Sequence, residues 1–233
     1  MHLSVQRLVR CFLAALACLA IATSGLPAAA SEPNIQLCNY DDLGTPIRIN
    51  FEDPRIESET LIDDVFGIGD VAFGESFSPR RPNIFDSWYT RGAYDNARPD
   101  AASPLRVYSG TAEENLALVK TNESQMLAGL GPPPDFLTGN GSISFGFHHA
   151  QVAVGFKVFA LGGKYKGGTI RIHVFDTSGT HLSYIYFEIS GASRVALCTQ
   201  NGLPVIGGIT ISNVVPGGIA IDDIKYGHAA MIS

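Results

Sequence analysis

Several motifs that mark catalytic and metal sites are missing from this 233-residue sequence. It has no G-x-S-x-G nucleophile elbow, no H-E-x-x-H pair and no Walker glycine pattern. Its histidines match no zinc template, and adjacent strand residues such as His148 and His149 are expected to point to opposite faces. These absences argue against a metalloprotease, a nucleotide hydrolase and a serine hydrolase. Glycoside hydrolysis by two carboxylates remains as the enzymatic alternative.

Apolar runs long enough to cross a membrane comfortably are not evident either. The segment CFLAALACLAIA at residues 11–22 is 12 residues long, and a membrane helix needs about 20. It follows two arginines and precedes the small residues Ala28 and Ala30. This pattern predicts a secretory signal peptide over residues 1–30, with lipidation at Cys18 as the alternative.

Positive charge is also scarce, with 16 Lys and Arg side chains against 22 Asp and Glu. Removing residues 1–30 takes Arg7 and Arg10 away, which leaves 14 basic side chains against 22 acidic ones and a net charge of −8. An acidic protein is a poor partner for nucleic acid or for anionic membrane surfaces. The remaining 203 residues are enough for one domain with a sizeable core.

Cysteine is limited to four residues, and Cys11 and Cys18 lie within the predicted signal peptide. Cys38 and Cys198 remain. In an oxidising compartment, an even pair of cysteines predicts one disulfide, with two buried thiols as the alternative. Such a bond would be structural and would tie the N-terminal segment to the late strands.

What the sequence does contain is a series of short alternating apolar runs separated by Gly and Pro turns. Examples are SISFGFHHA at residues 142–150, GTIRIHVF at 168–175 and GGIAIDDIKY at 217–226. Only TAEENLALVK at 111–120 competes as a helix. The pattern predicts an all-β protein, an antiparallel β-sandwich in one domain. The predicted organisation is a signal peptide (1–30), a lead-in (31–46), the sandwich (47–227) and a short tail (228–233).

An aromatic-rich segment, DSWYTRGAYDN at residues 86–96, lies in a region rich in Pro, Gly and Asp that is expected to be a long loop. Aromatic faces stack on sugar rings, and flanking polar groups bind hydroxyls. Alternatively, the single tryptophan fills one end of the sandwich core. The candidate ligand-binding residues are Trp88, Tyr89, Arg91, Tyr94, Asp95 and Asn96.

Two adjacent carboxylates, Asp222 and Asp223, interrupt the last expected strand, although aspartate is disfavoured in strands and like charges repel. The motifs INFEDP at residues 49–54 and IDDI at 221–224 resemble the paired ends of carbohydrate-binding-module-like jelly rolls. These galactose-binding-like sandwiches are common in secreted bacterial proteins, including PEP-sorted ones. The resemblance covers roughly residues 47–227 and implies a jelly roll.

In that family, an acid near the first strand and an acid of the last strand hold a structural calcium ion. The resemblance therefore implies Glu52 and Asp223 as calcium ligands, with Asp53 and Asp222 as neighbours or substitutes. Calcium takes six to eight oxygen ligands, which clustered carboxylates can supply. The alternative is that Asp223 caps backbone N–H groups and needs no metal.

These observations predict an exported, non-catalytic sandwich domain with structural calcium, whose partner is an extracellular glycan or another surface polymer. Two alternatives remain: a structural matrix or envelope protein that binds no sugar, and a secreted glycoside hydrolase or lyase. Neither nucleic acid nor membrane insertion is expected.

Overall fold

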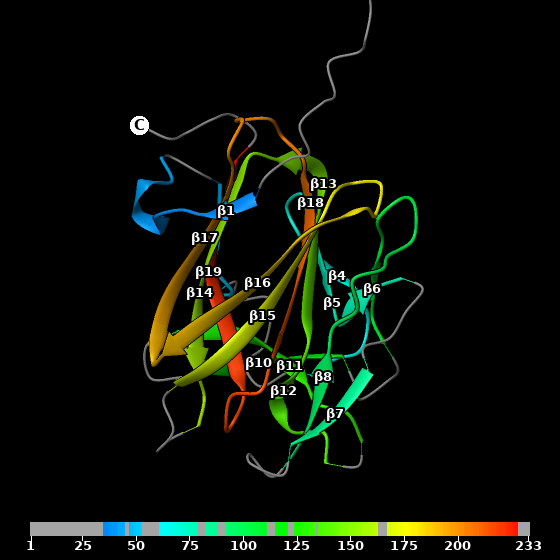
Figure 1. Cartoon of the computed structure of the whole chain (residues 1–233). Coiled ribbons are helices and arrows are strands. Elements are labelled where there is room, and N and C mark those ends of the chain that lie inside the picture. The colour runs from blue at the N-terminus through cyan, green and yellow to red at the C-terminus, as the bar shows by residue number, and fades with distance from the viewer. Residues whose placement is uncertain are drawn as a thin grey trace, which may run out of the picture. The chain divides into compact units, whose positions relative to one another are not determined.

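The computed structural model describes residues 35–44, 47–52, 61–78, 83–87, 92–110, 115–120, 124–133, 135–162 and 167–227. Two main antiparallel sheets pack as a sandwich (Figure 1), which confirms the predicted fold class. The helical element found in these ranges is a 3₁₀ turn, η1 (Tyr40–Asp42). Across the same ranges, no helix has the length and apolar character needed to cross a membrane.

The larger sheet has nine strands: β1 (Ile35–Leu37), β2 (Ile47–Ile49), β3 (Leu61–Ile62), β10 (Leu116–Lys120), β11 (Gln125–Leu130), β12 (Thr138–Gly141), β14 (Ala153–Ala160), β17 (Ala192–Thr199) and β19 (Ile219–Gly227). Their order is β1-β17-β14-β19-β11-β10-β3, with β12 beside β11 and β2 beside β19. Strand β19 therefore pairs with β14 along one edge and with both β11 and β2 along the other.

The second sheet has six strands: β4 (Phe66–Ile68), β5 (Val71–Gly74), β13 (Ile143–Gln151), β15 (Gly167–Phe175), β16 (His181–Ser190) and β18 (Ile206–Asn213). Their order is β16-β15-β18-β13-β5-β4, so β16 is an edge strand. Two short pairs complete the structure: β6 (Ser76–Phe77) with β9 (Val107–Tyr108), and β7 (Asn83–Ser87) with β8 (Gly92–Asn96).

Alternate residues of both sheets form one hydrophobic core. Phe145 of β13 and Ile172 of β15 face it from the smaller sheet, and Phe156 of β14 and Ile221 of β19 face it from the larger one, all fully buried. Burying one such side chain contributes about 1.5–3 kcal/mol. This period-two burial is what the alternating runs of the sequence predicted.

Cys38 and Cys198 form a disulfide with a Cα–Cα distance of 6.0 Å. This confirms the predicted bond, which is consistent with an extracytoplasmic protein. The bond lies beside β1, which pairs with β17 although the sequence assigned it to a lead-in.

One alternative is excluded and one expectation is wrong. Residues 116–120 form strand β10, which excludes the competing helix, because Leu116 and Leu118 alternate into the core. The region predicted as one long loop contains the antiparallel pair β7–β8, in which Asn83 lies opposite Asn96. The alternation of apolar and polar residues in these two strands is hard to see in the sequence, because their Asp, Asn and Gly residues are typical of loops.

Candidate functional site

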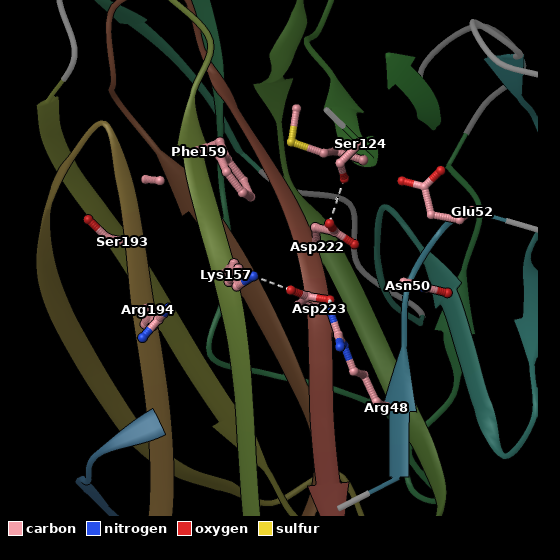
Figure 2. Close-up of a pocket in the computed structure, with 12 residues that line it drawn as sticks. Arg48, Asn50, Glu52, Ser124, Lys157, Phe159, Ser193, Arg194, Asp222 and Asp223 are labelled. Carbon is pink, nitrogen blue, oxygen red and sulfur yellow. Dashed lines mark hydrogen bonds and ion pairs between the residues drawn. The ribbon is translucent and has the colours of Figure 1, made fainter. Parts of the chain in front are cut away.

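An open pocket of about 760 Å³ crosses the face of the nine-stranded sheet that points away from the main core (Figure 2). We call it the sheet-face pocket. Strands β2, β11, β14, β17 and β19, with the segments that flank β2 and β11, supply its walls. The lining residues are Arg48, Asn50, Glu52, Ser124, Met126, Lys157, Phe159, Ala192, Ser193, Arg194, Asp222 and Asp223.

A β-bulge in β19 places both aspartates in this pocket. Lys157 of β14 lies opposite Asp222, but Gly155, two residues earlier, lies opposite Lys225, so β19 has one extra residue. Asp223 is that residue and has a positive φ of 50°, which aspartate tolerates better than most side chains do. Asp222 and Asp223 therefore share one face.

The extra residue in β19 also explains the spacing of the apolar side chains around the bulge. Ile221 and Ile224 both belong to the main core, with the two aspartates facing away between them. At this point β19 changes its partner on one edge, from β11 at Ile221 to β2 at Ile224. The Asp223 carbonyl accepts a hydrogen bond of 2.7 Å from the Tyr40 hydroxyl, which satisfies a backbone oxygen at the bulge.

The Asp223 carboxylate lies between two cations. Arg48 donates from Nε to Oδ1 at 2.7 Å and also from Nη2, while Lys157 is ion-paired to Oδ2 from the opposite side (Figure 2). Burial raises the pKa of Asp223, but the hydrogen bonds and charges of Lys157 and Arg48 outweigh it, so the pKa is lowered. We call Arg48, Lys157 and Asp223 the ion cluster.

Asp222 has a different environment. Its Oδ2 accepts a hydrogen bond of 2.7 Å from the Ser124 hydroxyl, and its Oδ1 is buried without a hydrogen-bond partner in the described part of the chain. Burial raises the pKa of Asp222, and the Ser124 hydrogen bond only partly opposes this. The adjacent carboxylates thus have pKa values shifted in opposite directions.

Both carboxylate oxygens of Asp223 contact cationic side chains, which would have to move for Asp223 to bind calcium. Glu52 lines the same pocket, where its Oε1 accepts a hydrogen bond of 2.7 Å from the Gln125 backbone. Asp53 lies outside the described residues. Within the described ranges, no three His, Cys, Asp or Glu side chains form a cluster that could hold a metal. Calcium binding by Glu52 and Asp223, with Asp53 and Asp222 as neighbours or substitutes, stays a prediction.

The pocket also has an apolar part. Phe159 of β14 and Met126 of β11 belong to a small cluster on the outer face of the sheet, together with Ala220 of β19. Phe159 is only partly buried. Across the pocket, Arg194 is ion-paired to Asp41 at 2.6 Å. The lining therefore combines an aromatic ring with several exposed polar groups.

The segment predicted to bind ligand is only partly described. Trp88, Tyr89 and Arg91 lie outside the described residues. Tyr94 is 1% exposed and donates a 3.2 Å hydrogen bond to the Val215 carbonyl.

Asp95 is also buried, and its Oδ2 accepts a hydrogen bond from the Ser142 backbone at 2.9 Å. Asn96 accepts a hydrogen bond from Arg171 at 2.7 Å. Tyr94 and Asp95 thus hold β8 against the sandwich and do not face a ligand surface.

Sequence reasoning missed an aromatic and histidine group on the outer face of β15 and β16. Tyr184 and Tyr186, two residues apart, are 39% and 63% exposed. Tyr184 stacks on His173 with ring centroids 4.4 Å apart, and His173 contacts His181 across the hairpin. The alternation of β16 could have located the tyrosines, but the histidine contact depends on a register shift in the hairpin.

A second open pocket, of about 890 Å³, lies over β4, β5 and β13 of the smaller sheet. Glycines contribute much of its lining, at Gly67, Gly69, Gly146 and Gly207. It therefore offers more backbone and apolar surface than side-chain polar groups. The sheet-face pocket is the better candidate for a polar ligand.

Comparisons with known proteins give a distant structural similarity and no family. No family model matches the sequence, and no curated protein matches it. A mutant of CBM29-2, one of the family 29 carbohydrate binding modules, has 10% sequence identity and a TM-score of 0.21, over 56% of this chain and 93% of that chain.

Proposed function

We propose that this chain is an exported, non-catalytic β-sandwich domain that binds carbohydrate in the sheet-face pocket. The observation that supports this most strongly is the pocket itself, which combines the Phe159 ring with exposed hydrogen-bonding groups. Its volume of about 760 Å³ lies within the range of about 300–1,000 Å³ that is typical of small-ligand sites.

The lining offers the two kinds of contact that a sugar needs. The exposed face of Phe159 can cover the C–H face of a pyranose ring, since aromatic rings provide a large and rigid apolar surface. Asn50, Arg48 and Arg194 can donate hydrogen bonds to ring hydroxyls, and Glu52 can accept them. The pocket can therefore supply both the stacking surface and the hydrogen-bonding groups that a sugar needs.

The ion cluster prepares part of this surface in advance. Asp223 fixes the head groups of Arg48 and Lys157 before any ligand arrives. Ordering a long side chain on binding costs about 0.5–1.5 kcal/mol. Side chains that are already ordered avoid most of this cost.

The acids of the pocket are less suited to hydrolysis. Asp223 is 4% exposed, and both its oxygens bind cations, so it is not available as a base or nucleophile. Asp222 is also buried and accepts a hydrogen bond from Ser124. Glycosidases need two carboxyl groups that reach the scissile bond, and only Glu52 is exposed here. This favours binding without catalysis.

A glycan array probed with the purified protein tests the proposal. We expect at least one glycan to be retained, and we expect Phe159→Ala and Asn50→Ala to weaken its binding by about tenfold or more, or at least 1.4 kcal/mol. Tyr186→Ala is the matched aromatic control on the other sheet and should bind as the wild type does. Equal binding by the wild type and both pocket variants would contradict the proposal, as would an array without any retained glycan.

A further inference from the structure

The hairpin of β15 and β16 brings two histidines together on the outer face of the six-stranded sheet. Its turn is closed by the Asp176 side chain, whose Oδ1 accepts hydrogen bonds from the Ser178 and Thr180 backbones at 2.9 and 2.8 Å. Beside the turn the register shifts between Val174 and Phe175, so that Phe175 lies opposite His181. This shift places His181 beside His173.

Two ring nitrogens converge at this point. Nδ1 of His173 lies 3.0 Å from Nε2 of His181. Two nitrogens bound to one metal at about 2.0–2.1 Å lie about 2.9 Å apart in a square-planar or octahedral arrangement, and about 3.3 Å apart in a tetrahedral one. The observed separation of 3.0 Å matches two neighbouring ligands of one ion and also matches a hydrogen bond between the two rings.

Both rings are at least partly buried. Burial, together with the charges of His181 and Arg171, lowers the pKa of His173, and burial also lowers the pKa of His181. Burial therefore favours the uncharged form of each imidazole, which is the form that metals bind.

The surroundings hold the rings in place. Tyr184 stacks on His173 with an interplanar angle of 23°, and Phe175 packs edge-on against His181 with ring centroids 5.4 Å apart.

We propose that His173 Nδ1 and His181 Nε2 together bind one divalent transition-metal ion, Cu²⁺ in preference to Ni²⁺ or Zn²⁺. Imidazole nitrogen suits all three ions, and the order of stability places Cu²⁺ first. No third His, Cys, Asp or Glu joins the pair within the described residues, so water completes the coordination. The site is independent of carbohydrate binding, because it lies on the other sheet.

The rival explanation is an ordinary N–H···N hydrogen bond between two neutral rings. Metal binding would replace that bond, and whichever ring donates it would move that proton to its other nitrogen, so no net proton is released. The charge of Arg171 near His173 disfavours a cation. We therefore expect a site of moderate affinity that does not hold the fold together.

Calorimetric titration of untagged protein with CuSO₄, in a buffer that does not bind metal, tests the proposal. We expect one saturable site per chain, and electron paramagnetic resonance should show hyperfine splitting from two nitrogens. His181→Gln should weaken the site at least tenfold, since even the loss of a group that supports a metal ligand costs about 10–100-fold. His181 is only partly buried, so this variant should keep its fold, which circular dichroism can check.

His149→Gln is the control, because the rings of His148 and His149 also lie close together, with centroids 4.7 Å apart. It should bind Cu²⁺ as the wild type does. Copper binding of unchanged affinity in His181→Gln would overturn the proposal, whether or not His149→Gln still binds. An absence of saturable binding by the wild type would also overturn it and would leave the hydrogen bond as the explanation.

Discussion

Replacing Asp223 by asparagine removes the one negative charge of the ion cluster and changes little else. Asparagine has nearly the same shape, and it also tolerates the positive φ of 50° at the bulge. The backbone carbonyl that accepts the Tyr40 hydrogen bond is retained. The variant therefore isolates what the carboxylate contributes to Arg48 and Lys157.

The expected loss is about 2 kcal/mol of unfolding free energy. Arg48 is 55% exposed, so its pair with the buried Asp223 is weakened by solvent and contributes about 0.5–1 kcal/mol. Lys157 is 30% exposed, and its charged hydrogen bond contributes about 1.5 kcal/mol. For a domain of this size, a loss of about 2 kcal/mol lowers Tm by about 4–8 °C.

Urea and thermal unfolding of the wild type, Asp223→Asn and Asp222→Asn at pH 7 measure this loss. Asp222→Asn is the matched control and should be nearly neutral, because burial raises the pKa of Asp222 and disfavours its charge. Each protein is also melted with a chelator. If Asp223→Asn is as stable as the wild type, the ion cluster does not stabilise the fold. A wild-type Tm that falls on chelation, with Asp223→Asn insensitive to it, would restore calcium as the explanation.

Three further results are expected. Because the pKa of Asp223 is lowered by folding, the stability difference between wild type and Asp223→Asn should be present above the ordinary aspartate pKa of about 3.9 and should be lost as the pH falls below it. Reducing the Cys38–Cys198 bond, which spans 160 residues, should lower the unfolding free energy by about 5 kcal/mol by loop entropy, and equal urea midpoints would contradict this. Tyr94→Phe should cost about 1 kcal/mol by losing its hydrogen bond to Val215, whereas a variant as stable as the wild type would show that this bond is not formed.

Much of the fold could be predicted because alternation and turn residues are local signals. The sandwich followed from them, and the disulfide followed from the pair of cysteines left after the predicted signal peptide. The bulge was also present in the sequence, since the apolar residues of β19 are spaced by two up to Ile221, by three to Ile224 and by two to Tyr226. That change of phase marks one extra residue in a strand.

The partners of Asp223 could not be predicted in the same way. Arg48 is 175 residues away in sequence and comes from a strand of three residues, and Lys157 lies in an otherwise apolar run. Acids near both chain ends suggested calcium, but the sequence did not show that two cations meet the same carboxylate. Long-range pairing of this kind depends on strand order, which periodicity does not determine.

The candidate ligand surface differed from expectation for a similar reason. An aromatic-rich segment with Gly, Asp and Asn resembles an exposed loop, yet Tyr94 and Asp95 face inward from β8. The lining of the sheet-face pocket joins residues of the INFEDP and IDDI motifs, such as Asn50, to residues such as Phe159 that lie in regular strands and belong to no motif. Only the assembled sheet brings them together.

The most direct test of carbohydrate binding in the sheet-face pocket is a titration of wild type and Phe159→Ala with the strongest glycan from the array, followed by calorimetry. We expect saturable wild-type binding that weakens by about tenfold or more in the variant, with both proteins folded and the glycan recovered uncleaved. Unchanged affinity in Phe159→Ala would contradict carbohydrate binding in this pocket, and cleavage of the glycan would show that the domain is catalytic.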